Sequence, residues 1–235
     1  MAKTELIVAL DFPTLEQALQ LVETLGDAVE YYKVGLELFS RCGTQVVKEL
    51  SNLGKKVFLD LKYHDIPNTV CSAAKVAIES GVFMYNLHAL GGLELMRAVA
   101  QQNRQYAKSL GVEPPIVVAV TILTSVDQEE LKRVGIGLPL EEEVLKLASL
   151  AKEAGLNGVV CSAKEVKPIK ELLGKNFVTV TPGIRPAWAA KNDQKRVLTP
   201  KEAAELGTDF IVVGRPITKA PDPKEAALKV LQELA

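Results

Sequence analysis

The sequence predicts an α/β protein that folds as a single (β/α)8 barrel, a TIM barrel, over residues 1–235. Eight short apolar runs alternate with segments of helical periodicity. The runs are almost continuously apolar, which is typical of parallel strands covered on both faces. An open doubly wound sheet is the alternative, but Phe12-Pro13-Thr14 follows the first run in place of the glycine-rich motif of that fold. No linker or abrupt change of composition marks a second domain.

The predicted strands are short and rich in β-branched residues, and each is followed by a helical segment. In chain order they are Leu6–Asp11, Tyr31–Gly35, Val57–Lys62, Met84–Ala89, Ile116–Leu123, Gly158–Ala163, Phe177–Gly183 and Phe210–Arg215.

The helices are predicted from apolar periodicity and from residues typical of helix ends. Thr14–Leu25 carries apolar residues on one face, and Thr14-x-x-Gln17 has the spacing of a capping box. The same spacing recurs after Ser162, Thr199 and Asp222, and a proline follows the last two at the first helical position. Glycines such as Gly111 and Gly174 are expected to end helices. The span Ser125–Gly155 is long enough for two helices, divided near Gly135–Pro139.

The charge balance excludes some classes of partner. Lys plus Arg number 28 and Asp plus Glu number 29, so the net charge is 28 − 29 = −1. We therefore expect neither nucleic acid nor a membrane surface as a general partner. The longest apolar run, Ile116–Leu123, is too short to span a bilayer. Three cysteines without a Cys-x-x-Cys pair and only two histidines predict no disulfide framework, no metal site and a cytoplasmic location.

A pair of charges interrupts the third predicted strand. Asp60 and Lys62 stand two residues apart, so their side chains share one face of the strand with Phe58. Leu59 and Leu61 point to the other face. We expect the charged face to be the barrel interior, at the end where the active sites of such barrels lie. Because burying charge is costly unless it is paired, a purely structural ion pair is the alternative interpretation.

Further charges come at or after the ends of neighbouring strands. Asp11 ends the first strand, Lys33 lies on the second, and Asp65 follows the third. Taken singly, Asp11 would most often cap a helix and Lys33 would most often be an edge residue. Together, Lys33, Asp60, Lys62 and Asp65 would alternate in sign at one barrel mouth. Such a set suits holding an ammonium group beside a reacting carbon.

The loops after the seventh and eighth strands predict a phosphate site, which is their common role in these barrels. Arg185 and Arg215 offer forked donors to phosphate oxygens, and Gly214 lets a ligand approach the backbone. The loop that runs up to Thr199 is long enough to act as a lid.

Four polar residues near strand ends allow two interpretations each. Thr124 and Ser125 could begin a helix or could donate hydrogen bonds to a ligand. His88, near the end of the fourth strand, could be a buried structural residue or a catalytic one, and so could His64.

Several segments, in order along nearly the whole chain, resemble the bacterial type of the orotidine 5′-phosphate decarboxylase family. They are Val8–Asp11, Lys33–Gly35, Leu59–Thr69, Leu123–Ser125, Thr181–Pro186 and Gly214–Ile217. The motif Asp60-x-Lys62-x-x-Asp65 alone is shared with sugar-phosphate enzymes of related barrels. Its continuation His64–Thr69, together with Leu123–Ser125, favours the orotidylate family.

This resemblance implies decarboxylation of orotidine 5′-monophosphate to uridine 5′-monophosphate (UMP) and CO2 in pyrimidine biosynthesis, without a cofactor or metal, by a homodimer with shared active sites. Lys62 would protonate C6 of the pyrimidine, and Asp60 would face the substrate carboxylate, with Lys33 and Asp65 completing the charge set. The resemblance further implies binding roles at ribose for Asp11, Lys33 and the neighbouring subunit's Asp65 and Thr69, at the pyrimidine for Thr124 and Ser125, and at the phosphate end for Pro182, Arg185, Gln194, Gly214 and Arg215.

Two other functions remain open from the sequence. A magnesium-dependent keto-sugar-phosphate decarboxylase or hexulose-phosphate synthase could use the same carboxylates and lysine for enediolate chemistry. A non-catalytic nucleotide-binding barrel would bind a phosphate ligand without turnover and would tolerate Lys62→Ala.

Overall fold

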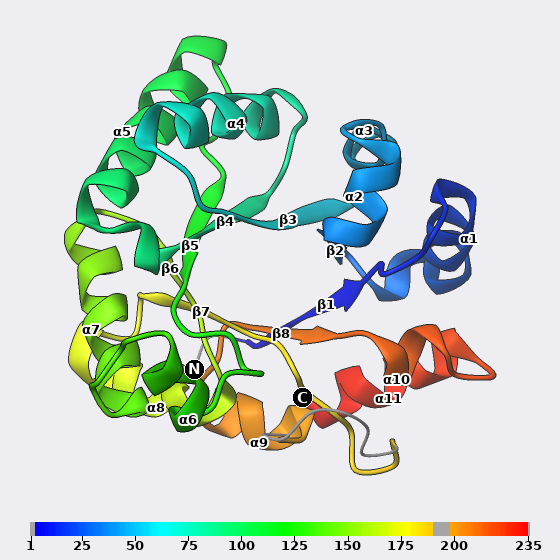
Figure 1. Cartoon of the computed structure of the whole chain (residues 1–235). Coiled ribbons are helices and arrows are strands. Elements are labelled where there is room, and N and C mark those ends of the chain that lie inside the picture. Colours follow the sequence, from blue (N-terminus) through cyan, green and yellow to red (C-terminus); the bar gives the residue numbers. More distant parts are fainter. Residues whose placement is uncertain (1–2, 190–197, 235) are drawn as a thin grey trace.

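The computed structural model describes residues 3–189 and 198–234. Eight parallel strands form a closed barrel in the order of the sequence, with helices around the outside (Figure 1). The single (β/α)8 barrel predicted from the sequence is therefore confirmed. The strands are β1 (Glu5–Ala9), β2 (Tyr31–Gly35), β3 (Lys56–Tyr63), β4 (Met84–His88), β5 (Ile116–Val120), β6 (Gly158–Val160), β7 (Val178–Thr181) and β8 (Phe210–Val213).

The helices follow the strands as the alternating pattern predicts. In chain order they are α1 (Leu15–Leu25), η1 (Gly26–Ala28), α2 (Leu36–Cys42), α3 (Gln45–Asn52), α4 (Pro67–Glu79), η2 (Ala89–Gly91), α5 (Leu93–Leu110), α6 (Gln128–Arg133), α7 (Leu140–Glu153), α8 (Ala163–Leu173), α9 (Pro200–Glu205), α10 (Arg215–Thr218) and α11 (Pro223–Glu233).

The helix ends show which local signals were correct. Ser162 and Thr199 form full capping boxes, whereas Thr14 and Asp222 accept one bond each from the backbone three residues on. Gly111 ends α5 in the left-handed conformation, at φ 67°. The predicted division of the long span into two helices is confirmed, as α6 and α7. The unit after β2 contains two helices, α2 and α3, where the pattern predicts one.

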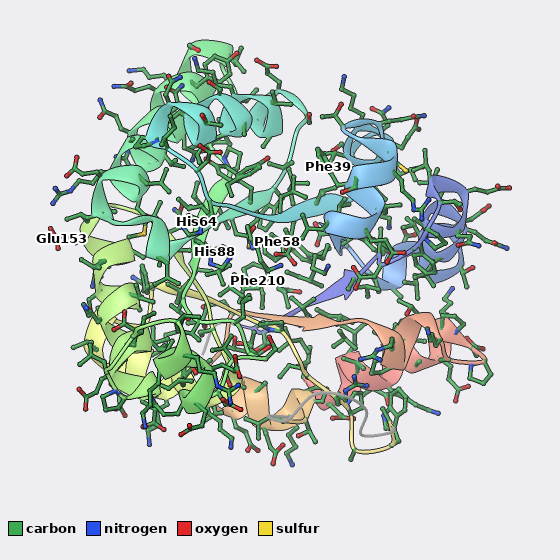
Figure 2. The ribbon with its side chains drawn as sticks, viewed as in Figure 1. Phe39, Phe58, His64, His88, Glu153 and Phe210 are labelled. Atoms are coloured by element: carbon green, nitrogen blue, oxygen red, sulfur yellow. The ribbon has the colours of Figure 1, made fainter. Side chains whose placement is uncertain are left out.

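The barrel interior is apolar at the end where the strands begin. Phe58, Met84 and eight other buried apolar side chains fill it, mostly valines. Tyr31, Phe83 and Phe210 pack edge to face across that end, with ring centroids 5.3 to 6.1 Å apart. Phe58 and Phe210 lie within the ring of strands, whereas Glu153 lies at the periphery (Figure 2). Charged side chains, among them Asp60 and Lys62, line the interior toward the carboxyl ends of the strands.

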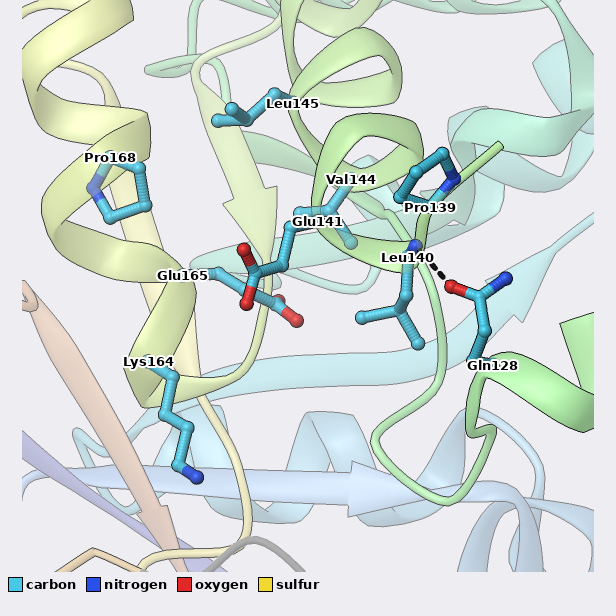
Figure 3. Close-up of a pocket in the computed structure, with 9 residues that line it drawn as sticks. All are labelled: Gln128, Pro139, Leu140, Glu141, Val144, Leu145, Lys164, Glu165 and Pro168. Atoms are coloured by element: carbon cyan, nitrogen blue, oxygen red, sulfur yellow. Dashed lines mark hydrogen bonds between the residues drawn. The ribbon is translucent and has the colours of Figure 1, made fainter.

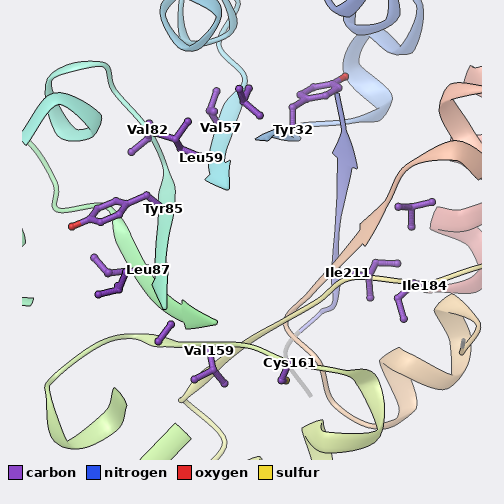
Figure 4. Close-up of a cluster of buried hydrophobic side chains, with 14 of the residues drawn as sticks. Tyr32, Val57, Leu59, Val82, Tyr85, Leu87, Val159, Cys161, Ile184 and Ile211 are labelled. Carbon is purple, nitrogen blue, oxygen red and sulfur yellow. The ribbon is translucent and has the colours of Figure 1, made fainter. Parts of the chain in front are cut away.

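The larger apolar core lies between the strands and the surrounding helices. Tyr32, Leu59, Tyr85, Leu87 and Val159 point outward from their strands into this layer (Figure 4). Burying each such side chain contributes about 1.5–3 kcal/mol. Since the strands are covered on both faces, their runs are continuously apolar, as the sequence predicts.

Six strands end earlier than the sequence predicts, β4 by one residue and β7 by two. β1 ends at Ala9 instead of Asp11, β5 at Val120 instead of Leu123, β6 at Val160 instead of Ala163, and β8 at Val213 instead of Arg215. A strand needs a paired neighbour, and β6 pairs with β5 only as far as Val160. The polar residues expected at these strand ends therefore lie in the loops that follow, except Arg215, which begins α10.

Candidate active site

Two adjoining cavities of about 200 Å³ each lie at the carboxyl ends of the strands. One is lined by Lys33, Asp60 and Lys62 with apolar residues of β3, β5, β6 and β8. The other contains Asp11, Arg185, Gly214 and Arg215. Lys33, Pro182 and Val212 line both cavities, so the two form one continuous site with a mainly apolar part and a cationic part.

The alternation of side chains along β3 places Asp60 and Lys62 in the first cavity. Phe58 belongs to the interior cluster, and Asp60 and Lys62 follow it on the same face and line the cavity. Leu59 and Leu61 pack outward against the layer beneath the helices. This arrangement confirms the prediction made from the two-residue spacing.

The charged side chains alternate in sign across β1, β2 and β3. Lys62 Nζ lies 2.7 Å from Asp60 Oδ1, and Lys33 Nζ lies 3.6 Å from Asp60 Oδ2. Lys33 Nζ also lies 2.9 Å from Asp11 Oδ1. The Asp60 and Lys33 side chains are only 13% and 12% exposed, whereas Asp11 is 56% exposed. Attraction between nearly buried charges is screened little by water, so these side chains hold one another in place.

Gly35, at the end of β2, leaves room for the Lys33 ammonium group. A Cβ atom at this position would lie 2.6 Å from Lys33 Nζ and 3.3 Å from Asp11 Oδ1. Any larger residue would therefore displace the lysine from its two carboxylate partners.

Lys62 has an unusual backbone. Its φ is 52°, and within the described ranges it is the one residue other than glycine with a positive φ. Such a conformation costs about 1–3 kcal/mol and persists only where surrounding contacts impose it. This conformation directs the Lys62 side chain toward Asp60, to which its ammonium group donates a hydrogen bond.

The cationic part of the site follows β7 and β8. Arg185 is buried, at 6% exposure, and Arg215 lies at the first position of the short helix α10, directly after Gly214. Two guanidinium groups at this end of the barrel suit a phosphate. Gln194 lies outside the described residues, so its predicted contact and the predicted lid stay predictions.

Thr124 and Ser125 line the first cavity from the loop after β5. This loop begins before the predicted end of the strand at Leu123, because the pairing of β5 with β6 ends at Val120 and Val160. The Thr121 hydroxyl donates a hydrogen bond to the Val160 carbonyl at 3.2 Å. Thr124 and Ser125 therefore share this cavity with Lys62.

Asp65 and Thr69 are not brought to the charge set within one chain. Both are exposed, in the loop after β3 and the first turn of α4. Asp65 accepts a hydrogen bond from the Ile66 backbone, and no ion pair joins it to any residue within 3–189 or 198–234. In the single chain, Asp11 takes the fourth place in the alternating set.

Asn86, on β4, is a site residue that the sequence reasoning missed. Its side chain is fully buried and bonds both Asp60 and the Lys62 backbone. A polar residue within the apolar run Met84–Ala89 was the available signal. His88, two residues on, lies beside His64 with the ring centroids 5.4 Å apart, and burial lowers the pKa of His88. His88 therefore adds no positive charge beside Lys62 at neutral pH.

A larger cavity, of about 450 Å³, lies elsewhere, between α7 and α8 (Figure 3). Glu141 and Glu165 face it beside Leu140, Val144 and other apolar side chains. Its carboxylates disfavour a phosphate, and its lining contains one cation, Lys164. The barrel mouth is therefore the better candidate for the active site.

Residues 3–189 and 198–234 contain no group of three or more His, Cys, Asp or Glu side chains arranged to hold a metal ion. Over the same ranges, no helix has the length and apolar character needed to cross a bilayer.

Comparison with known proteins gives a consistent result. The model of the orotidine 5′-phosphate decarboxylase / HUMPS family matches residues 4–230. An orotidine 5′-phosphate decarboxylase from Syntrophomonas wolfei is 50% identical over 235 residues, which cover 99% of this chain and 98% of the relative. Another, from Carboxydothermus hydrogenoformans, is 53% identical over 229 residues, covering 97% and 95%.

Solved structures agree with these relatives. The crystal structure of orotidine 5′-phosphate decarboxylase from Lactobacillus acidophilus matches with a TM-score of 0.87 at 43% identity, covering 98% of this chain and 99% of that one. The Methanocaldococcus jannaschii enzyme, complexed with the inhibitor BMP, matches with a TM-score of 0.77 at 27% identity, covering 99% of each chain.

Proposed function

Since the chain belongs to the orotidine 5′-phosphate decarboxylase / HUMPS family, we infer that it converts orotidine 5′-monophosphate to UMP and CO2 in pyrimidine biosynthesis. The observation that carries the mechanism is the Lys33–Asp60–Lys62 set, which faces an apolar cavity next to a cationic one. The apolar cavity suits a pyrimidine, and the cationic cavity suits the phosphate of the same nucleotide.

The chemistry requires an ammonium group beside C6. When the bond between C6 and the carboxylate breaks, its electron pair stays on C6 in an orbital that cannot delocalise into the ring. Lys62 Nζ, held at 2.7 Å from Asp60, stabilises the developing negative charge and then donates a proton to C6. CO2 leaves, and UMP remains. Asp60 faces the position of the substrate carboxylate and holds the Lys62 ammonium group in place.

The remaining roles follow the two cavities. Ser125 bonds the pyrimidine edge and Thr124 lines the same pocket, whereas Asp11 and Lys33 bond ribose hydroxyls. The phosphate is held at the other end of the site. Its binding set consists of Pro182, Arg185, Gly214 and Arg215 in the second cavity, with Gln194. Contacts to the phosphate, far from C6, supply binding energy that positions the base for reaction.

A homodimer with shared active sites explains the placement of Asp65 and Thr69. Both are exposed and lie away from the site of their own chain. Exposed apolar side chains follow three neighbouring strands at the same end of the barrel: Leu36 after β2, Ile66 after β3 and Leu90 after β4, at 58%, 66% and 45% exposure. A partner that covers this patch would bring its own Asp65 and Thr69 toward the site across the interface. The three free cysteines support a cytoplasmic location for this dimer.

The function is tested by the loss of near-ultraviolet absorbance of orotidine 5′-monophosphate, measured with and without EDTA. We expect rapid turnover that EDTA does not change, because the proposed chemistry runs on side chains alone. Chromatography should identify UMP as the product. Activity that is lost in EDTA and restored by Mg²⁺ would favour the sugar-phosphate enzymes of this family. Tight UMP binding without turnover would favour a non-catalytic barrel.

A further inference from the structure

Strands β3 and β4 lose their regular register within the active site. Leu59 pairs with Tyr85 and Tyr63 pairs with Leu87, so Asp60, Leu61 and Lys62 lie opposite the single residue Asn86. A bulge of this kind leaves backbone groups of the longer strand without partners in the ladder. The charged residues of the site lie in this bulge.

The Asn86 side chain supplies one of the missing backbone partners and also bonds the Asp60 carboxylate. Its Oδ1 accepts a hydrogen bond from the Lys62 backbone N–H at 2.8 Å, and its Nδ2 donates to Asp60 Oδ1 at 2.7 Å. Asn86 is fully buried, so neither bond competes with water. The same Asp60 oxygen also receives the Lys62 ammonium group.

One amide thus fixes two elements of the charge set. The bond to the backbone holds Lys62 in its positive-φ conformation, which directs the side chain back toward Asp60. The bond to the carboxylate fixes the rotation of Asp60, so that its second oxygen faces Lys33. An apolar residue at position 86 would fill the same space and fix neither element.

We propose that Asn86 is a positioning residue for the decarboxylation. It holds the Lys62 ammonium group and the Asp60 carboxylate in the positions from which they act at C6 of the substrate. The inference rests on the proposed function, and it adds a role that lies on β4, outside the charged motif of β3. Asn86 is not a catalytic residue, because it acts through Asp60 and Lys62.

The charged and titratable groups around position 86 determine how a substitution there behaves. β3 contributes Asp60 and Lys62, β2 contributes Lys33 beyond Asp60, and β4 itself contributes His88. On the other side, Asn86 pairs with Val118 of β5, which carries no charge. A carboxyl group at this position would therefore meet Asp60 directly, with both lysines close by.

The Asn86→Asp variant tests the proposal through the pH dependence of kcat. An ionised carboxylate would repel Asp60, whereas a protonated one would donate to Asp60 as the amide does. We expect the ratio of variant kcat to wild-type kcat to be highest at low pH. It should fall by about tenfold per pH unit above the pKa of the carboxyl pair. Taking the ratio cancels the titration of the substrate phosphate and of groups common to both proteins.

Asn86→Leu removes both bonds and adds no titrating group. We expect kcat to fall by about 10²-fold at every pH, the scale of a 1 Å misplacement, with KM changed less than about threefold. UMP binding and thermal unfolding show whether either variant is folded. If Asn86→Asp does not fold, the proposal is tested by Asn86→Leu alone, through a fall in kcat that is much larger than the change in KM.

Asn103→Asp is the matched control. Asn103 is also buried, and it accepts from the Tyr85 hydroxyl and donates to the Pro115 carbonyl, away from the site. This variant should lose stability and keep the wild-type pH profile of kcat. The proposal is overturned by a flat ratio for Asn86→Asp, or by a kcat of Asn86→Leu within about twofold of wild type. Wild-type turnover, measured first, tests the proposed function separately.

Discussion

Replacing Lys62 with alanine is expected to abolish turnover almost completely, by at least about 10⁴-fold in kcat. The variant loses the proton donor and also the positive charge beside the developing carbanion. Folding should be retained, because Asp60 keeps Lys33 and Asn86 as partners. The measurement is the absorbance assay at saturating substrate, with UMP binding as the check on folding.

Lys56→Ala is the control for this variant. Lys56 begins the same strand but lies at the opposite end of the barrel, where it pairs with Glu30 at 3.0 Å. Its loss should leave kcat unchanged. A Lys62→Ala variant that retains more than about a tenth of wild-type turnover would show that another group protonates C6.

Mixing two inactive variants is expected to restore activity if sites are shared. In a hybrid dimer of Lys62→Ala with Asp65→Ala, one site lacks both groups. The other site has Lys62 from one chain and Asp65 from its partner. A purified hybrid should therefore show about half of the wild-type activity per dimer. If Asp65 served the site of its own chain, each site of the hybrid would keep one defect and the activity would stay at the level of the parent variants.

A second hybrid controls for effects of mixing itself. Lys62→Ala paired with Asp60→Ala affects two groups that lie on one strand and serve the same site. Each site of that hybrid loses one of them whether or not sites are shared across the dimer, so no activity should return. Tags of different charge allow both hybrids to be isolated before assay.

The fold and most of β3 could be predicted because they follow from local periodicity. In β3, two leucines alternate with Phe58, Asp60 and Lys62. When the leucines face the helices, the other three side chains must face the barrel interior. The cationic part of the site could be predicted as well, since Arg215 follows the last strand and phosphate sites are common at that place in such barrels.

The contacts that depend on register could not be predicted. The bulge in β3 opposite Asn86 determines which groups Asn86 contacts. The sequence of one strand does not determine the register in which that strand pairs with the next. The left-handed backbone of Lys62 has the same origin, since that residue type does not favour it. Asp65 stands in the charged motif, yet its side chain is exposed in the single chain. Sequence spacing alone does not show whether the side chain of a loop residue reaches the site of its own chain.

The measurement that tests the central claim most directly is exchange of the C6 hydrogen of UMP in D2O, followed by proton magnetic resonance. A site that stabilises the C6 carbanion and protonates it from Lys62 must also run the reverse proton transfer. The wild-type protein should therefore replace the C6 hydrogen with deuterium and leave the C5 hydrogen in place, and Lys62→Ala should show no exchange above the rate without enzyme. Exchange at C6 that continues undiminished in Lys62→Ala would contradict the assignment of Lys62 as the proton donor.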